Sequence, residues 1–394
     1  MQTVPTINAQ LFSWMRDVRE TIHQHPELSL EESSTAAFIS EKLSEIGVGP
    51  VRQAAGTGLI TEIGPADASP IVGLRADMDA LPVTEDTGLA FSSTTSGVMH
   101  ACGHDGHIAM LLGAAVLLKD LDLPGRVRLL FQPAEERANG AEKMIAEDAI
   151  KNLEAIFSGH IDTHYETGII TVDEGIVCAF TDPFVVRLTG SSGHAARPHE
   201  CKDTIIAAAG LITTLQTLVS REIDPNHAAV LTVGKIRAGQ THNVIAGETV
   251  IEGTIRSTHP DARKRMLLGL ERMVQGAASN YEVHADLKFL ESLPAVINNC
   301  KAAVLARKAA QIIVDEKNVI SQGPSSLGGE DFAFYLQQIP GCMIRFGAKK
   351  SDETGPAHSS TFDFDDRVLP VGAAWYAEVA KTFLQDHPTQ MNSK

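Results

Sequence analysis

Residues 99–107 constrain this chain more than any other stretch, because Met-His-Ala-Cys-Gly-His-Asp-Gly-His gathers one cysteine, three histidines and one aspartate. The apolar run 108–118 follows at once and predicts a buried helix. The polar cluster is therefore expected in a turn at a helix N-terminus, where backbone N–H groups and the helix dipole favour a thiolate. Gly103 lets the backbone bend, so Cys102 and His104 can point at one spot as ligands of a divalent transition metal. The alternative is a polar loop whose histidines are only solvated.

Size and composition limit the class of protein. A chain of 394 residues, 43% hydrophobic and 21% charged, is long enough for about two domains. The net charge of −16 argues against a nucleic-acid partner. The longest apolar run is too short to span a bilayer, so no membrane partner is expected. Five scattered cysteines without paired spacing, and no visible signal peptide, predict a soluble cytoplasmic protein.

Three predicted strands each deliver acidic or histidine residues just past their carboxyl ends. The strands and the residues that follow them are 71–76 with Asp77 and Asp79, 126–131 with Glu135 and Glu136, and 155–157 with His160. Sites in open α/β sheets form at the carboxyl ends of strands. These three ends and the turn at 99–107 are therefore expected to converge on one cleft.

The other elements complete two domains. In the first domain the patterns predict helices at about 6–24, 31–46, 299–316 and 367–385, and strands at 58–63 and 343–346. From residue 180 the predicted order becomes β-α-β-β-α-β, with strands 184–189, 229–236, 249–256 and 283–289 and helices 203–221 and 261–280. The fold class is therefore α/β. A catalytic domain with a mixed sheet flanked by helices (1–180 and 292–394) carries an inserted ferredoxin-like α+β lid or dimerisation domain (181–291).

Two neighbouring carboxylates can divide the chemistry of a metal site between them. Glu135 and Glu136 point in different directions, so one can bind a metal while the other takes a proton from a metal-activated water. Like charges side by side also raise one pKa, which suits a general base. The alternative is a solvated acidic turn. His160, and His358 in a Gly/Pro loop, are imidazole ligands that carry little weight alone.

The inserted domain offers residues for substrate binding. His194 lies in a loop rich in small residues and could reach an oxyanion. Asn243 is a candidate for amide recognition, and Arg256 for a substrate carboxylate. The alternative for Arg256 is an ordinary surface charge on a strand.

Together these segments resemble the aminoacylase and glutamate-carboxypeptidase family of metallopeptidases. The resemblance is strongest to its amidohydrolase branch, which includes N-acyl-amino-acid, hippurate and indole-acetyl-amino-acid hydrolases. The matching motifs are His-Pro-Glu at 25–27, Arg-Ala-Asp-Met-Asp-Ala-Leu-Pro at 75–82, residues 100–107, Gln-Pro-Ala-Glu-Glu at 132–136, Gly-His-Ala-Ala-Arg-Pro-His at 193–199, His-Asn-Val-Ile at 242–245, Gly-Thr-Ile-Arg at 253–256, Glu-Asp-Phe at 330–332 and His358.

The resemblance implies two divalent ions per subunit, zinc or manganese, with cobalt or nickel as further candidates. The ligands that it implies are Cys102 as the bridging thiolate, His104, Glu136, His160 and His358. Glu135 is then the base, Asp79 the orienting aspartate, and His194 the oxyanion donor. Some relatives supply that histidine from a second subunit, which implies a homodimer through the lid domain. The chain departs from the wider family at Asp77, where a histidine ligand is usual.

The sequence thus predicts a metal-dependent amidohydrolase of linear amides. It would cleave the amide bond of a small-molecule N-acyl amino acid, or a related conjugate, by metal-activated water with Glu135 as base. One alternative is a thiol hydrolase with Cys102 as nucleophile. The other is a non-catalytic binding or dimerisation protein on the same fold. The acyl group, the amino acid and the native metal stay open.

Overall fold

The computed structural model describes residues 4, 6–351 and 354–386. The chain forms two compact units. Unit 1 comprises residues up to 175, 297–323 and those from 330 onward, and unit 2 comprises 176–296 and 324–329. Unit 2 thus extends beyond the expected 181–291 at both ends. The sequence patterns did not predict that residues 324–329 group with it.

Unit 1 is built on a mixed sheet, as expected. Its strand order is β1-β2-β4-β3-β5-β16-β6-β15. β3 runs parallel to β4 and β5, and β16 runs parallel to β5, whereas β2 is antiparallel to β4. The strands are β1 (Arg52–Ala54), β2 (Gly58–Ile63), β3 (Ile71–Asp77), β4 (Arg126–Gln132), β5 (Ala155–Glu166), β6 (Ile170–Thr171), β15 (Val319–Ile320) and β16 (Gly341–Lys349). A separate pair joins β7 (Gly175–Cys178) and β14 (Val296–Asn298), at the two points where the chain first passes from unit 1 to unit 2 and back.

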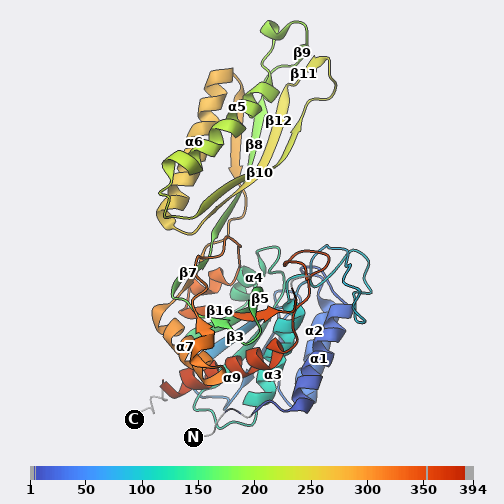
Figure 1. The fold of residues 1–394 in the computed structure, drawn as a ribbon, viewed down its shortest axis with the longest axis vertical. Helices are drawn as coiled ribbons and strands as arrows, with labels where there is room; N and C mark the ends of the chain where they lie inside the picture. Colours follow the sequence, from blue (N-terminus) through green and yellow to red (C-terminus); the bar gives the residue numbers. More distant parts are fainter. Residues whose placement is uncertain (1–3, 5, 352–353, 387–394) are drawn as a thin grey trace. The chain divides into compact units, whose positions relative to one another are not determined.

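Four helices of unit 1 lie side by side over one face of this sheet, in the order α1, α3, α9 and α7 (Figure 1). α3 is apolar on every side and all its residues except Val116 are buried, as expected for a central core helix. The helices of unit 1 are α1 (Ala9–Gln24), α2 (Ser33–Glu45), α3 (His104–Leu118), α4 (Gly140–Ala146), α7 (Cys300–Ile313), α8 (Ala333–Leu336), α9 (Val368–Asp386) and the short η3 (Glu316–Asn318).

Two details of unit 1 correct the sequence-based expectation. α3 begins at His104, so this residue lies in the first helical turn and not in the turn before it. β5 continues to Glu166, so His160 lies inside a strand and not after its end. The reason is β16, which pairs with β5 in parallel from Ile156 to Asp162 and supplies backbone hydrogen bonds through the polar residues.

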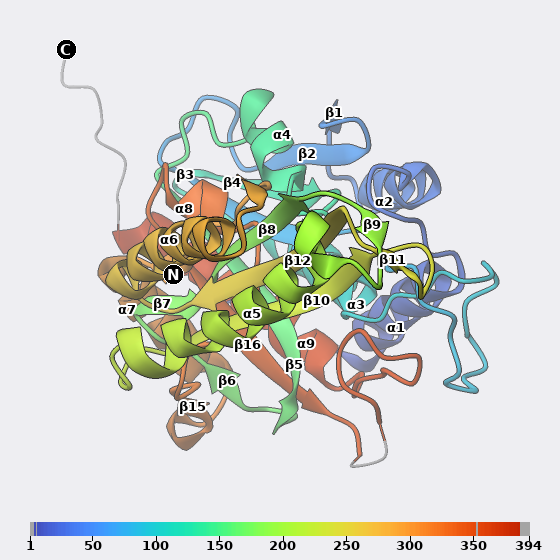
Figure 2. The ribbon, with the colours of Figure 1, turned by 90° about the horizontal axis from the view of Figure 1, so that it is seen from above.

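Unit 2 has the ferredoxin-like topology that the sequence predicts. Its antiparallel sheet has the order β10-β12-β8-β13, and α5 and α6 lie against one face of β8 and β12 (Figure 2). Its elements are β8 (Phe180–Thr189), β9 (Gly193–His194), η1 (Pro198–Glu200), α5 (Thr204–Thr217), η2 (Leu218–Glu222), β10 (Ala229–Ala238), β11 (Val244–Ile245), β12 (Glu248–Ser257), α6 (Pro260–Tyr281) and β13 (His284–Phe289).

One stretch of unit 2, Thr204–Glu222, is long and apolar enough to cross a membrane by length and composition, and it is alone in this among the described helices. Leu211, Leu215 and Leu218 from this stretch are buried in the core of unit 2. Packing against the unit 2 sheet therefore accounts for the apolar side chains on its inner face.

Candidate metal centre

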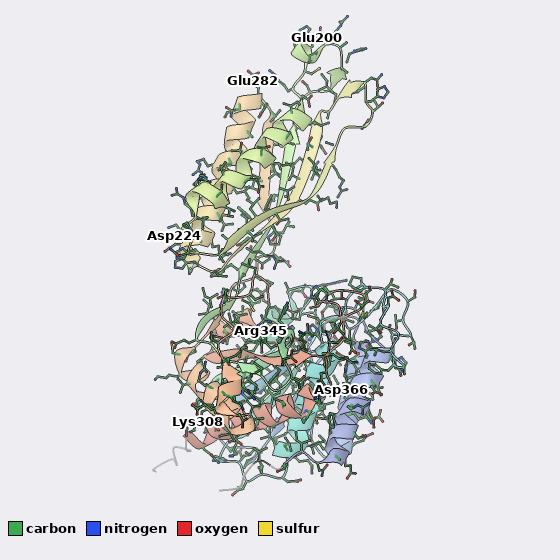
Figure 3. The ribbon with its side chains drawn as sticks, in the orientation of Figure 1. Glu200, Asp224, Glu282, Lys308, Arg345 and Asp366 are labelled. Atoms are coloured by element: carbon green, nitrogen blue, oxygen red, sulfur yellow. The ribbon has the colours of Figure 1, made fainter. Side chains whose placement is uncertain are left out.

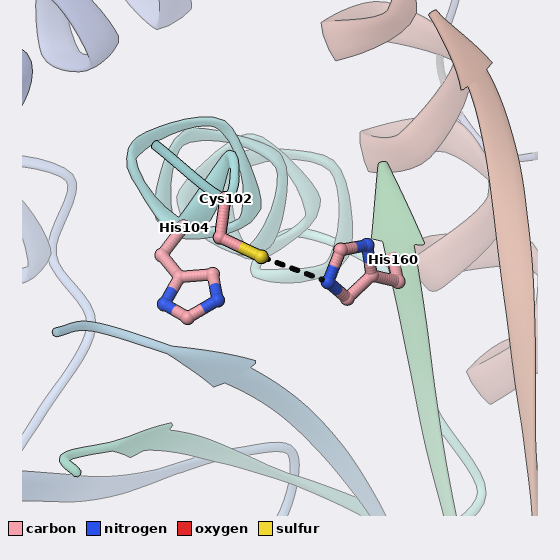
Figure 4. Close-up of side chains that lie close together, drawn as sticks. All are labelled: Cys102, His104 and His160. Carbon is pink, nitrogen blue, oxygen red and sulfur yellow. Dashed lines mark hydrogen bonds between the residues drawn. The ribbon is translucent and has the colours of Figure 1, made fainter. Parts of the chain in front are cut away.

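Three of the predicted ligands meet where α3 begins beside β5. Sγ of Cys102 lies 3.6 Å from Nε2 of His160, and the two side chains face each other across the gap in Figure 4. Ligand atoms of Cys102, His104 and His160 all lie within 4.8 Å of one another. The turn depends on Gly103, whose φ is +87° and whose ideal Cβ position is only 3.3 Å from Cβ of Ile161. A larger residue there would be strained and crowded against β5.

The hydrogen bonds of the two histidines leave one nitrogen of each ring for a metal. Nδ1 of His104 lies 2.9 Å from the backbone oxygen of Asp79, and Nδ1 of His160 lies 2.6 Å from that of Ile161. A carbonyl only accepts, so each Nδ1 donates and each Nε2 is the nitrogen that can bind an ion. Nε2 of His104 is buried without a hydrogen-bond partner. This is the arrangement of metal-binding imidazoles.

A second ligand set shares the same cysteine. Ligand atoms of Cys102, Glu136 and His358 also lie within 4.8 Å of one another. Oε1 of Glu136 is 3.3 Å from Nε2 of His358 and 4.0 Å from Nε2 of His104. The backbone N–H of His358 donates to the oxygen of Ala101 at 2.7 Å, which ties the His358 loop to the cysteine turn. Cys102 belongs to both sets of three, so these five side chains would offer ligands for two ions, with its sulfur available to either.

Asp79 holds the backbone that carries both glutamates. Its Oδ1 accepts the N–H of Glu135 at 3.1 Å, and its Oδ2 accepts the N–H of Glu136 at 3.0 Å and the hydroxyl of Ser29 at 2.6 Å. Its backbone oxygen receives Nδ1 of His104. Asp79 thereby orients one ligand and the backbone of two carboxylates, in keeping with the orienting role that the sequence predicts.

The electrostatics separate the roles of the ionisable groups. Burial raises the pKa of Glu135 well above its usual value, and Glu330 and the neighbouring Glu136 add to the effect. Burial also lowers the pKa of His160 well below its usual value, so that ring is a neutral imidazole. Burial opposes a charge on His104, but Asp77 and a hydrogen bond to Asp79 raise its pKa well above normal. A metal ion must therefore displace a proton from Nε2 of His104.

The cysteine has the wrong environment for a free nucleophile. Burial, and the charge of Glu136 after it, raise the pKa of the Cys102 thiol to about 12. Catalytic thiols have depressed pKa values because only the thiolate attacks. The thiol becomes a thiolate here only if something as strong as a metal ion replaces its proton.

Two residues near the centre are structural supports. His107 uses both ring nitrogens, because Nδ1 lies 2.6 Å from Oδ1 of Asp77 and Nε2 accepts the N–H of Ile161 at 2.8 Å. Asp77, which stands where the wider family has a histidine, also accepts from Nη1 of Arg75 at 2.7 Å. Both ring nitrogens of His107 are therefore engaged, whereas Asp77 stays part of a further group, with His104 and His107, whose ligand-type atoms lie within 4.8 Å of one another.

A buried cluster around Arg19 supports the start of α3, and sequence reasoning missed it. Arg19 donates to Oδ2 of Asp105 at 3.2 Å and to Oδ1 of Asp363 at 2.6 Å, and it also bonds Asp366, which Figure 3 labels beside α1. Nδ1 of His23 lies 2.9 Å from the same Asp105 carboxylate. The available signal was an arginine on the buried face of α1, among apolar positions.

The predicted substrate residues of unit 2 do not all come together. His194 pairs with Val244 across β9 and β11, and the oxygen of Asn243 accepts from Ala195 at 3.1 Å, so His194 and Asn243 are neighbours. Both are exposed, in and beside the short strands β9 and β11 that Figure 1 labels.

Arg256 lies toward the other end of the unit 2 sheet. It is eight residues beyond the start of β12 at Glu248, or roughly 26 Å at a rise of about 3.3 Å per residue. Nη1 of Arg256 donates to the oxygen of Leu327 at 2.9 Å, and burial lowers its pKa. Within one copy of unit 2, His194 and Arg256 therefore cannot contact the same small molecule.

In unit 1, two candidate ligand sets that share Cys102 stand beside a desolvated glutamate, and this combination is typical of metal-dependent hydrolases. The chain belongs to the peptidase family M20/M25/M40, whose family model matches residues 73–382. The family resemblance predicted from the motifs is thereby confirmed.

Characterised relatives cover nearly the whole chain. It is 39% identical over 372 residues to the N-acetyl-L-cysteine deacetylase of Bacillus subtilis, covering 94% of this chain and 88% of that protein. It is 37% identical over 386 residues to the IAA-amino acid hydrolase ILR1-like 2 of Arabidopsis thaliana, covering 96% and 87%. A solved Bacillus subtilis structure described as a dinuclear metal binding peptidase from the M20 family matches with a TM-score of 0.84 at 33% identity, covering 96% of this chain and 99% of that one.

Proposed function

We propose that this chain hydrolyses the amide bond of an N-acyl amino acid or a similar small amino-acid conjugate, using two divalent ions held in unit 1. The observation that carries the proposal is the convergence of two ligand sets on Cys102, beside the desolvated carboxylate of Glu135. The similarity to an N-acetyl-L-cysteine deacetylase and to an IAA-amino acid hydrolase supports this substrate class.

The five ligand side chains fit the ions by their chemistry. They offer one thiolate, three imidazoles and one carboxylate from Cys102, His104, His160, His358 and Glu136. Mixed sulfur, nitrogen and oxygen donors suit zinc or manganese, with cobalt or nickel as further candidates. When bound, such ions polarise a substrate carbonyl and lower the pKa of a water molecule.

In this proposal Glu135 is the residue that moves the proton. Its raised pKa suits a group that takes a proton from the attacking water and passes it to the leaving amine. Asp79 fixes the backbone N–H of Glu135, so the carboxylate is presented from a held position. We propose His194 as the donor to the oxyanion, Asn243 for the amide and Arg256 for the substrate carboxylate.

The separation of His194 from Arg256 supports a homodimer. The roughly 26 Å between their ends of the unit 2 sheet exceeds the length of an N-acyl amino acid. If both residues act on one substrate molecule, two copies of the chain must contribute. Size-exclusion chromatography with light scattering tests this, and an active monomer would remove one of the two residues from the mechanism.

We also infer a cytoplasmic enzyme that acts on small molecules. The five cysteines, all of them described residues, form no disulfide with one another, which suits a reducing compartment. The net charge of −16 disfavours a nucleic-acid partner.

A metal-dependence assay separates this proposal from its rivals. Purified protein is stripped with EDTA and assayed on a panel of N-acyl amino acids after adding Zn²⁺, Mn²⁺, Co²⁺ or Ni²⁺. A metal amidohydrolase loses activity with EDTA and regains it with one of these ions. A thiol hydrolase using Cys102 keeps its activity in EDTA and loses it to iodoacetamide. A binding protein shows no turnover with any metal.

Substitution of the base gives a second test. Glu135→Gln keeps the shape of the side chain and should lower kcat by about 10²–10⁴, the usual range for loss of a general base. It should still bind two ions by elemental analysis. Glu142→Gln, an exposed carboxylate on α4, is the matched control and should retain wild-type kcat. Wild-type turnover by Glu135→Gln would place the base elsewhere.

A further inference from the structure

The loop that carries Glu135 and Glu136 closes tightly on itself. This carboxylate loop, residues 133–140, connects β4 to α4. The N–H of Gly140 donates to the oxygen of Ala134 at 3.1 Å, and Ala134 adopts a φ of +54°. An ideal Cβ on Gly140 would lie only 1.6 Å from the oxygen of Pro133, so the two ends of the loop are in direct contact. The position of both glutamates depends on how these ends are held.

One buried carboxylate from a distant part of the chain holds both ends. Asp331 is fully buried. Its oxygens accept Nε2 of Gln132, at the entry to the loop, at 2.8 and 2.9 Å. Its Oδ2 also accepts the N–H of Ala141, at the exit of the loop, at 2.9 Å. Nη2 of Arg75 donates to Oδ1 at 3.0 Å, and Nε of Arg75 donates to Oε1 of Gln132 at 2.9 Å, which completes the network.

The adjacent Glu330 does not hold the loop, although it shares the arginine. Its Oε1 accepts Nη2 of Arg75 at 2.9 Å and the N–H of Phe332 at 2.9 Å. The ligand-type atoms of Glu135, Glu330 and Asp331 lie within 4.8 Å of one another, and burial together with the nearby Glu330 raises the pKa of Asp331 to about 8. Of the two residues Glu330 and Asp331, it is Asp331 that bonds residues on both sides of the carboxylate loop. The chain thus contains a matched pair that separates the loss of a carboxyl group beside Arg75 from the loss of the contacts to the loop.

We propose that Asp331 is a positioning residue for the metal centre, which clamps both ends of the carboxylate loop so that Glu136 and Glu135 stand in fixed places beside Cys102 and His104. The inference rests on the proposed function for its relevance to catalysis. Asp79 holds the middle of the loop through the N–H groups of Glu135 and Glu136, and Asp331 holds its two ends.

The test compares Asp331→Asn with Glu330→Gln. Each variant replaces one carboxyl group next to Arg75 with an amide of the same shape. Asparagine also replaces one acceptor oxygen of Asp331 with an NH₂ group. Because both oxygens accept from donors of Gln132, Ala141 or Arg75, the NH₂ group must face one of these donors, and the hydrogen bond on that side is lost. Zn²⁺ affinity is measured by chelator competition, and the Co²⁺-loaded protein is examined by visible absorption.

Asp331→Asn should bind the more weakly held Zn²⁺ with about 10–100-fold lower affinity, the range seen when outer supports of ligands are removed. Its Co²⁺ spectrum should change, and kcat should fall while KM stays close to wild type. Glu330→Gln should keep the wild-type Zn²⁺ affinity and Co²⁺ spectrum. Equal Zn²⁺ affinities for Asp331→Asn and Glu330→Gln would overturn the proposal.

A second variant covers a failure of Asp331→Asn to fold. Gln132→Met leaves the carboxyl group of Asp331 in place but removes its hydrogen bonds at the entry of the loop. It should weaken Zn²⁺ binding in the same way, and wild-type affinity in this variant would also overturn the clamp. The proposed amide hydrolysis is tested separately, because a wild-type protein that binds two ions but cleaves no N-acyl amino acid refutes that function and leaves the Zn²⁺ comparison intact.

Discussion

Metal binding to this centre should release protons, and Cys102 should be the main source. Burial and Glu136 raise the pKa of the Cys102 thiol to about 12 in the metal-free chain. At pH 7 only about 10⁻⁵ of such a thiol is ionised, and removing its proton costs about 7 kcal/mol. Because only the thiolate binds a metal, the ion must supply this free energy and expel the proton. His104, whose pKa is also well above normal, should contribute a second proton.

The sign of the pH dependence follows from these protonated ligands. Raising the pH removes the competing protons, so the apparent affinity for Zn²⁺ must rise. Each released proton gives about a tenfold increase in affinity per pH unit. Wild-type protein should therefore gain at least about tenfold per pH unit between about pH 6.5 and 8 from the Cys102 proton, and Cys102→Ser should lose that part of the slope, on this linkage rule. The serine should also bind more weakly overall, because a hydroxyl replaces a soft thiolate.

Isothermal titration calorimetry measures the proton count directly. Zn²⁺ is titrated into metal-free protein in two buffers of different ionisation enthalpy at one pH. The difference in observed heat gives the number of protons released. Cys300→Ser, which changes an exposed thiol in the first turn of α7, is the control and should match wild type. If Cys102→Ser releases as many protons as wild type, Cys102 is not a ligand and the assignment of the bridge is wrong.

Three further substitutions test other parts of the molecule. His194→Ala should lower kcat by about 10²–10³, the range for loss of one oxyanion donor, without changing the metal content. Loss of metal would show that His194 is a ligand, and an unchanged kcat would show that its role is structural. Burial opposes protonation of His23, but hydrogen bonds to Asp105 and Glu85 raise its pKa to about 9. Protonated His23 therefore stabilises the folded protein fully below about pH 6.5, and this contribution is lost as the pH rises through 9. Urea unfolding should show up to about 3 kcal/mol of this loss in wild type and none in His23→Gln. In Gly140→Ala the new methyl group must displace the Pro133 oxygen, so the free energy of unfolding should fall by several times the roughly 0.5 kcal/mol of an ordinary surface change. Gly276→Ala is the control, because this glycine faces open space on α6. It should raise the free energy of unfolding by about 0.5–1 kcal/mol in the same assay.

The parts of the fold that local patterns control could be predicted from the sequence. β2 was expected at 58–63 and is found there, because apolar residues bounded by glycine define it without help from distant segments. The β-α-β-β-α-β order of unit 2 follows from the same kind of signal. The candidate ligands Cys102, His104 and Glu136 and the candidate base Glu135 could be singled out from the sequence because they stand in short motifs at element ends.

The parts that depend on distant partners could not be predicted. His160 was expected after a strand end, but the strand continues because β16, which begins at Gly341, pairs with it. β6 and β15 contain two residues each and exist only through their pairing with neighbours. The Asp331 clamp joins atoms 190 and 199 residues apart in the chain, and no periodicity records such a contact.

The grouping of residues 324–329 with unit 2 has a consequence for protein engineering. The N–H of Ser326 donates to Val177, the N–H of Ala179 donates to Gly328, and Arg256 donates to Leu327. The chain therefore crosses between the units four times, and unit 2 is not a single insertion. Removal of 176–296 alone would leave residues 324–329 without their hydrogen-bond partners. These residues directly precede Asp331, which holds the carboxylate loop. A chimera that takes unit 2 from a relative must exchange both segments together.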